Sequence, residues 1–331
     1  MSREAKVPYD PPFAFHPGVF LAEKLEEMKM SNKEFALRTN KPEKTITAII
    51  KGESSITPDM AVVFETALGI PAYMWLKYQS IYDEFKARER KEELLKESIP
   101  WMKRFPVAEM INKGWLPEAK TPEEKTKALL QFFGIASYAA WEDYYLNQKL
   151  KTVFSISLFG MEKLEPISVW LRRGELEASE IEVPEFSASK LKTTLSVIKR
   201  LPNTSNGDIS GLKELLAKSG VKIVLTPVIN KIPLTGATRW LAGETPLIQL
   251  SDKIKSNEQF QLTLFHQIGH ILLHGKKDIF LNGINYPGLV LSKEREAETF
   301  ASKWILNEPA EPKDLKLKPA TKLVSQGFIN P

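Results

Sequence analysis

The stretch Ser256–Gly275, which reads SNEQFQLTLFHQIGHILLHG, constrains the fold more strongly than any other part of the chain. Ser256 with Gln259 three residues later is typical of a helix N-terminus, and the closing glycine is typical of a helix end. The strongly apolar residues between them predict a buried helix. Histidines four residues apart lie on one face of a helix, one turn from each other. His266 and His270 can therefore bind one tetrahedral Zn²⁺ ion.

Metal binding in this chain depends on histidine and carboxylate side chains. The 331 residues include four histidines and no cysteine, which excludes disulfides and thiolate zinc sites. Three of the four histidines lie in this helix. His274 is about 12 Å from His266 along the helix axis, so we interpret it as a C-terminal histidine stabilised by the helix dipole. The alternative to a metal site is a pair of core histidines, each with its own hydrogen-bond partners.

The missing protein ligand is expected from a second helix. The stretch EREAETFA, residues 294–301, contains three carboxylates, those of Glu294, Glu296 and Glu298. We choose Glu296 as the third ligand beside the two histidines. The alternative is an acidic, solvent-exposed helix start, because carboxylates favour helix N-termini.

Strand patterns precede the histidine helix. Runs rich in β-formers at 221–226, 234–241 and 247–250 follow a predicted helix at 211–218. They predict an α+β domain over 206–331.

Helical spacing dominates the rest of the chain. Aromatic and leucine residues recur at this spacing between about 101 and 205, which predicts a helical middle region whose aromatic residues form a packed core. The nearly continuous charges of 86–96 predict an exposed helical connector. We therefore expect a multidomain chain with a flexible arm at 1–13, an all-α domain at 14–82, a helical connector and middle domain at 83–205, and the α+β domain at 206–331.

The all-α domain has the spacing of a helix-turn-helix. Ser31 begins a capping-box pattern, and a small residue, Ala36, falls where two helices must approach closely. Asn40 falls at the turn, where asparagine tolerates a left-handed backbone. Ile46 and Ile49 then fall where the second helix needs apolar anchors.

The second helix of this motif is predicted from Pro42, at the first helical position, to Lys51. In a helix-turn-helix, the N-terminal residues of the second helix contact base edges and flanking basic residues contact phosphates. A plain helical bundle that carries lysines is the alternative. The candidate DNA-contacting residues are Lys33, Arg38, Lys41, Glu43, Lys44, Thr45, Thr47 and Lys51.

The overall charge and hydropathy set weaker limits on function. The net charge of +5 and the isoelectric point near 9.0 permit a polyanionic partner without requiring one. The sequence has neither a signal-peptide pattern nor an apolar run long enough to cross a bilayer. We expect a cytoplasmic protein with no membrane partner.

Three stretches of the N-terminal domain carry a resemblance to a known family. They are His16-Pro17-Gly18, the run KPEKTI at 41–46 and the run ITPDMA at 56–61. Over about residues 14–80 the chain resembles the HigA-type antitoxins, within the Cro-type repressor class of helix-turn-helix proteins. The resemblance implies a homodimer that binds a double-stranded DNA operator, represses its own operon and neutralises a toxin partner.

The C-terminal domain resembles a second family. The histidine helix, followed by Glu296-Ala297 and Phe300-Ala301, is similar to the ImmA/IrrE family of zincin-like metallopeptidases. Trp170-Leu171-Arg172 resembles longer members that carry a HigA-type domain. The resemblance implies a Zn²⁺ cofactor, Glu296 as the third ligand and regulatory proteolysis of a repressor. Similar proteins are expected to continue beyond Pro331.

One residue departs from the metallopeptidase pattern. These enzymes have a glutamate directly after the first histidine, where it accepts a proton from zinc-bound water. The residue here is Gln267, which has no proton-accepting form near neutral pH. Metal binding and folding are expected to survive this difference. A natural pseudoenzyme and a deliberate inactivating substitution are both consistent with it.

Three hypotheses of function follow. The first is a DNA-binding transcriptional regulator or antitoxin with a metallopeptidase-like domain that Gln267 disables, and whose partner is a toxin or a repressor. The second is a regulatory zinc endopeptidase, with glutamate at position 267, that cleaves a repressor, a toxin or itself. The third is a structural metal domain that only binds a partner.

Overall fold

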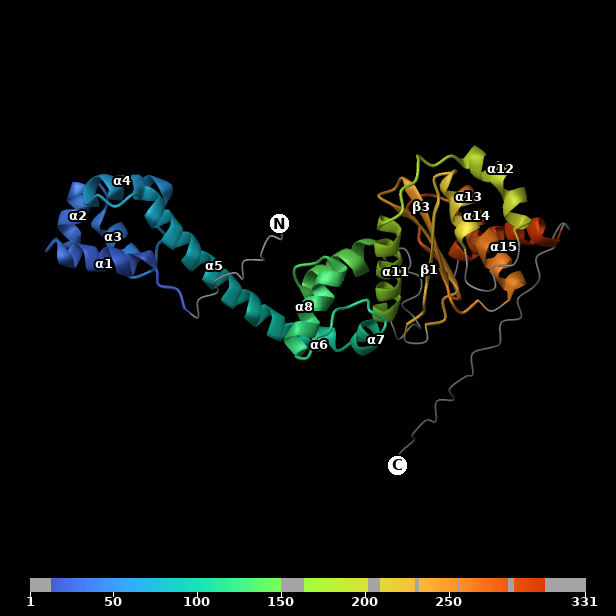
Figure 1. The fold of residues 1–331 in the computed structure, drawn as a ribbon, viewed down its shortest axis with the longest axis horizontal. Coiled ribbons are helices and arrows are strands. Elements are labelled where there is room, and N and C mark those ends of the chain that lie inside the picture. The colour runs from blue at the N-terminus through green and yellow to red at the C-terminus, as the bar shows by residue number, and fades with distance from the viewer. Residues whose placement is uncertain are drawn as a thin grey trace, which may run out of the picture. The chain divides into compact units, whose positions relative to one another are not determined.

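The computed structural model describes residues 13–149, 164–201, 209–229, 232–254, 256–284 and 289–306 (Figure 1). The chain divides into two compact units, Met1–Glu97 and Ser98–Pro331. The predicted arm lies outside the described residues except for Phe13.

The first unit is entirely helical over its described residues. Its helices are α1 (Pro17–Glu27), α2 (Asn32–Arg38), α3 (Glu43–Ile50), α4 (Pro58–Leu68) and α5 (Ala72–Glu97). The predicted connector is the second half of α5, because its charged run continues the helix without a break. Only Trp75 and Gln79 of α5 are buried, which agrees with the predicted exposure of that run.

A compact apolar core joins the helices of this unit. Phe35, Ile46, Ile49, Phe64 and Trp75 are fully buried in it. The two isoleucines are the anchors that the helix-turn-helix spacing predicts.

Contact between α1 and the end of α3 explains the His16-Pro17-Gly18 motif. His16 caps α1, and its Nδ1 atom accepts a hydrogen bond from the Gly18 N–H over 2.9 Å. A Cβ atom at Gly18 would lie 1.8 Å from the Ile49 carbonyl oxygen. Only glycine permits this approach, so the motif holds α3 against α1.

The second unit begins with a helical part, as predicted. Its helices are α6 (Ile99–Met102), α7 (Val107–Asn112), α8 (Pro122–Phe133), α9 (Tyr138–Trp141), the π-helix η1 (Glu142–Lys149), α11 (Leu164–Ser179) and α12 (Ala188–Lys199). Trp101, Phe105, Phe133 and Trp141 pack edge to face in its core. These aromatic residues form a core, as we expected.

A small mixed sheet forms the centre of the second unit. Helix α13 (Ser210–Ala217) leads into strands β1 (Lys222–Thr226), β2 (Gly236–Leu241), β3 (Thr245–Ser251) and β4 (Phe280–Asn282). The sheet order is β1-β3-β2-β4, in which β1 is parallel to β3 and β2 is antiparallel to both of its neighbours. Thr238 of β2 pairs with Ile248 on one side and with Phe280 on the other.

Helices cover both faces of this sheet, as Figure 1 shows. Helix α11 packs on one face, where Leu247 contacts Ala178. Helix α14 (Asn257–Leu273) and helix α15 (Leu289–Leu306) lie on the other, where Ile248 and Leu250 join the main core. The predicted fold class, with an all-α N-terminal domain, a helical middle and an α+β C-terminal domain, is confirmed. Among the described helices, none combines the length and the hydropathy that a bilayer crossing requires.

Candidate metal centre and nucleic-acid interface

Helix α14 presents two buried histidines between the sheet and α15. Ser256 caps the helix by accepting a hydrogen bond from the Gln259 N–H over 3.1 Å, as the sequence predicts. His266 and His270 lie one turn apart, with their ring centroids 4.6 Å from each other. The ring of Phe280, on β4, stacks on His270 with a centroid separation of 3.8 Å and fixes one face of that imidazole.

Small residues let α15 approach α14 closely. A Cβ atom at Gly269 would lie 3.3 Å from the Cα atom of Ala297, so the two backbones are nearly in contact there. Ala297 and Ala301 are fully buried on the inner face of α15. Glu294 is three residues before Ala297 and therefore shares that face.

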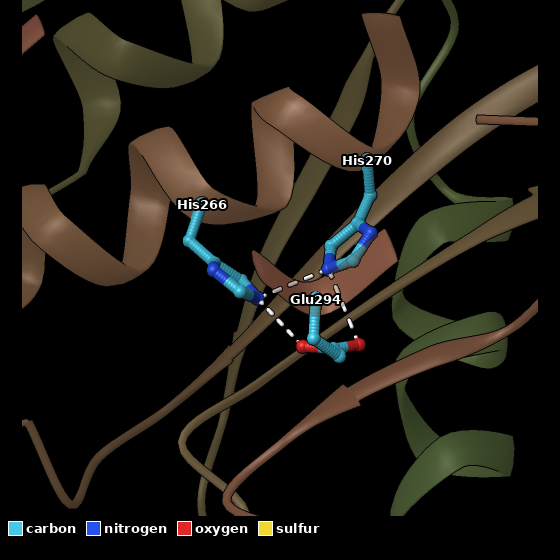
Figure 2. A group of neighbouring side chains, drawn as sticks. All are labelled: His266, His270 and Glu294. Carbon is cyan, nitrogen blue, oxygen red and sulfur yellow. Dashed lines mark hydrogen bonds and ion pairs between the residues drawn. The ribbon is translucent and has the colours of Figure 1, made fainter. Parts of the chain in front are cut away.

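The three side chains meet in one cluster, which Figure 2 shows. Glu294 Oε2 lies 3.1 Å from His266 Nε2, and Glu294 Oε1 lies 3.4 Å from His270 Nε2. The two Nε2 atoms are 3.0 Å apart. All three potential ligand atoms lie within 4.8 Å of one another, so one ion can contact them all.

The protonation states of the cluster suit a metal ion. Burial lowers the pKa of His270 to about 4, so this imidazole is neutral near pH 7. Burial alone would raise the pKa of Glu294, but hydrogen bonds from His266 and His270 lower it to about 2. Metal ligands must be deprotonated, and both of these groups already are. Glu294 Oε1 is also buried and has no well-aligned hydrogen bond in the described part of the chain, although His270 Nε2 lies 3.4 Å from it, which fits an oxygen that can bind an ion.

The structure corrects the sequence-based choice of carboxylate. Glu296, which we predicted as the third ligand, does not belong to the cluster, and Glu294 takes that position. Two residues along a helix correspond to a rotation of about 200°, so the two side chains leave α15 in different directions. The side chain of Glu296 is 61% exposed, against 12% for Glu294. The spacing of Glu294, Ala297 and Ala301 is the sequence signal that identifies the inner face.

His274 lies at the C-terminus of α14 and outside the cluster, as we interpreted it, but its side chain has contacts that the sequence did not indicate. Helix α14 ends at Leu273, and His274 is its extended C-cap, with φ −118° and ψ 168°. Its side chain turns inward, so that its Nδ1 atom lies 3.0 Å from His270 Nδ1. Its Nε2 atom lies 3.4 Å from Glu296 Oε2. His274 therefore contacts the ring of a candidate ligand.

Gln267 is fully buried between α14 and β2. Its Oε1 atom accepts a hydrogen bond from the Thr238 hydroxyl over 2.6 Å. Its Nε2 atom has no hydrogen-bond partner among the described residues and faces Gly236, where a Cβ atom would lie 3.3 Å away. No local sequence pattern links Thr238 to this residue, because the two lie 29 residues apart in the chain and meet only where β2 packs on α14.

The first unit has the geometry of a helix-turn-helix. Ser31 caps α2 as predicted, and Asn40 adopts the left-handed backbone at the turn, with φ 49°. Pro42 is the N-cap of α3 and not its first helical residue, because its ψ of 134° is extended. The proline therefore ends the turn, and α3 begins at Glu43.

The predicted DNA-contacting residues occupy α2, the turn, α3 and, for Lys51, the C-cap of α3. Within α3, Glu43 and Lys44 are exposed, whereas Thr45 and Thr47 are half-buried. Lys33, Arg38 and Lys51 are exposed and Lys41 is half-buried. Arg38 forms an ion pair with Glu34 over 2.6 Å, which leaves the lysines as the more available cations on this surface.

Comparison with known families agrees with this division of the chain. Residues 21–74 match the helix-turn-helix family, and residues 218–316 match the family described as IrrE N-terminal-like domain. The chain therefore joins a Cro-type helix-turn-helix domain to an IrrE N-terminal-like domain.

Individual relatives match the N-terminal part. The HTH-type transcriptional regulator YddM of Escherichia coli strain K12 is 29% identical over 73 residues, which are 22% of this chain and 78% of YddM. An addiction module antidote protein of the HigA family from Coxiella burnetii is 33% identical over 25% of this chain and 91% of its own, with a TM-score of 0.24. The Pseudomonas aeruginosa antitoxin HigA, solved with the higBA promoter, is 26% identical over 24% of this chain and 89% of its own, with a TM-score of 0.24.

Proposed function

We propose that this chain is a DNA-binding transcriptional regulator of the antitoxin type whose C-terminal domain holds Zn²⁺ and binds a protein partner without hydrolysing it. The observation that carries the proposal is the cluster of His266 and His270 on α14 with Glu294 on α15, in which glutamine and not glutamate follows the first histidine, at position 267. A ligand set with no adjacent proton acceptor suits binding better than catalysis.

The DNA-binding part of the proposal rests on α3. Its apolar anchors, Ile46 and Ile49, are buried, while Lys44 at its N-terminal end is exposed. In this motif that end of the second helix enters the major groove. The match of residues 21–74 to the helix-turn-helix family supports the same role. A homodimer on an inverted repeat is the arrangement we propose.

The proposed zinc site is supported by the chemistry of its three ligand side chains, His266, His270 and Glu294. Two neutral imidazoles and one carboxylate are common ligands of catalytic zinc, with a fourth position open to water or to a partner's side chain. Zinc held by these residues would lower the pKa of a coordinated water to about 7. The match of residues 218–316 to the IrrE N-terminal-like family supports this assignment.

The binding role rests on Gln267. Its amide keeps the size and the hydrogen bonding of glutamate but cannot accept a proton near neutral pH. Its buried position and its bond to Thr238 hold the side chain in place. We therefore propose that the domain senses or docks a toxin, a repressor or another protein segment.

The retained ligand set favours one alternative, a regulatory zinc endopeptidase. In that function, a form of the chain with glutamate at position 267 cleaves a repressor, a toxin or the chain itself. The two functions share the zinc site and differ only in proton transfer, so exchanging residue 267 separates them.

The DNA-binding function is tested by selecting sequences from random double-stranded DNA with the full chain. We expect an inverted repeat whose half-site centres are about 10 base pairs apart or a multiple of that distance, which a footprint upstream of the chain's own gene should reproduce. Selection of no sequence, together with no footprint, would remove the regulator hypothesis.

A further inference from the structure

We propose that His274 and Glu296 are positioning residues that fix the tautomer and the ring orientation of His270. This inference rests on the proposed zinc site. It assigns a role to the two polar side chains that lie beside the cluster but outside it.

The two nitrogens of His270 face different neighbours. Its Nε2 atom lies 3.0 Å from His266 Nε2 and 3.4 Å from a Glu294 oxygen, so it faces the cluster. Its Nδ1 atom faces away and lies 3.0 Å from His274 Nδ1. A neutral imidazole carries one N–H. A ligand nitrogen at Nε2 therefore places the proton on Nδ1, where His274 is the acceptor.

The tautomer of His274 follows from that of His270. If its Nδ1 atom accepts a hydrogen bond, its own proton must be on Nε2. That Nε2 atom is buried and has no well-aligned hydrogen bond in the described part of the chain. Glu296 Oε2 lies 3.4 Å from it, and the exposed side chain of Glu296 can rotate to improve the alignment. The carboxylate therefore completes a chain of N–H donors that begins at His270.

Local structure holds these side chains together. His274 leaves α14 as an extended C-cap, and its backbone N–H still donates to the His270 carbonyl oxygen over 3.1 Å. The ring of Phe280 stacks on His270 and lies 5.2 Å from the centroid of His274. This apolar ring therefore lies against both imidazoles. A histidine that served only the helix dipole would not need an inward orientation.

The series from Glu296 through His274 to His270 has a measurable consequence. Outer partners of ligand histidines fix the tautomer and raise the basicity of the ligand, and their loss typically weakens metal binding 10–100-fold. We expect this weakening from His274→Leu, which removes the acceptor. His274→Asn should restore most of the affinity, because the Asn Oδ1 atom can accept at the position of Nδ1.

Two measurements on the full chain test the proposal. Zinc affinity is measured by competition with a chromophoric chelator for the wild type, His274→Leu, His274→Asn and Glu296→Ala. Glu298→Ala is the matched control, because it removes a second exposed carboxylate from α15. We expect a 10–100-fold loss for His274→Leu, a smaller loss for Glu296→Ala and no change for the control.

The second measurement needs no substitution. In the zinc-loaded wild type, ¹⁵N–¹H correlation of the imidazoles should show His270 with its proton on Nδ1 and His274 with its proton on Nε2. The opposite tautomer at either residue would overturn the proposal, as would unchanged affinity in His274→Leu. A wild-type chain that takes up no zinc would overturn the metal site itself and this proposal with it.

Discussion

The hydroxyl of Thr238 on β2 donates a hydrogen bond to the Oε1 atom of Gln267 on α14 over 2.6 Å, in the buried space between the sheet and the helix. The amide Nε2 atom of Gln267 has no hydrogen-bond partner in the described part of the chain. The Thr238 hydroxyl therefore satisfies one of the two polar atoms of this amide and leaves its donor unpaired.

Removal of this hydroxyl should destabilise the second unit. In Thr238→Val the amide oxygen of Gln267 loses its partner while it stays buried, and we expect the free energy of unfolding to fall by about 1–3 kcal/mol. Thr238→Ser keeps the hydroxyl and is the control for shape. The double variant Thr238→Val with Gln267→Met should recover most of the loss, because replacing both polar partners is nearly neutral. Denaturant unfolding measures all four proteins, and equal stability of Thr238→Val and the wild type would contradict the prediction.

Sequence patterns predicted the helix and the histidine pair of this site but not its complete geometry. The spacing of His266 and His270 depends only on helix periodicity, which is local. The choice between Glu294 and Glu296 depends on which face of α15 packs against Gly269, and only Ala297 and its buried partner Ala301 indicate that face. That three- and four-residue spacing favours Glu294.

The pairing of strands that are far apart in the chain could not be predicted from the sequence. Strand β4 has three residues, too few for a recognisable alternation, and it exists because Phe280 pairs with Thr238 of β2. That pairing places an aromatic ring on His270. The inward turn of His274 likewise follows from the end of α14 at Leu273, which gives His274 an extended backbone.

Zinc binding should depend on Glu294. The full chain, prepared without added metal, should contain about one zinc per chain by elemental analysis, since one tetrahedral site is present. Glu294→Ala and His270→Ala should each lose this zinc, because two remaining ligands hold the ion poorly. Glu298→Ala should retain it. Zinc retained undiminished in Glu294→Ala would exclude the cluster as the metal site.

Lys44 should contribute to DNA affinity. Lys44→Ala should weaken binding to the selected operator by about 1–3 kcal/mol, concentrated at one base position, if the side chain reads a base edge. A phosphate contact would instead weaken binding to all sequences alike and reduce the salt dependence. Lys77→Ala, at an exposed lysine of α5, is the control for the change in charge. Titration of fluorescent duplexes at fixed salt distinguishes these results, and equal affinities of the two variants would contradict a role for Lys44.

His16 should make the stability of the chain depend on pH. Burial lowers its pKa below the ordinary 6.5, although nearby Asp83 opposes the shift. Protonation therefore favours the unfolded state, so the contribution of His16 is fully present above about pH 6.5 and is lost as the pH falls toward its folded pKa. His16→Asn keeps a capping acceptor for the Gly18 N–H but does not titrate in this range. The stability difference between the two proteins, measured by denaturant unfolding, should change in favour of the variant as the pH falls below 6.5, and a constant difference would contradict the prediction.

Catalysis should depend on residue 267. Gln267→Glu places a carboxylate where the Thr238 hydroxyl donates, and it removes the buried donor that has no partner among the described residues. With zinc bound, that carboxylate would supply the proton acceptor that the glutamine form lacks. Burial raises the pKa of a carboxyl group, which brings a base at this position closer to neutral pH. General acid–base transfer is worth typically 10²–10⁴-fold, so we expect the glutamate form to cleave a protein that the glutamine form only binds.

Both forms, loaded with zinc, are incubated with the chain itself, with the product of a neighbouring gene and with candidate repressors, and intact mass reveals new termini. Gln267→Met is the control that packs without a base, and a chelator should abolish any cleavage. Equal cleavage by the glutamine and glutamate forms would refute the assignment of residue 267 as the base. If neither form cleaves a protein that demonstrably binds, the endopeptidase alternative is removed, because a complete ligand set with a restored base would then still lack activity. Docking would remain as the function of the domain.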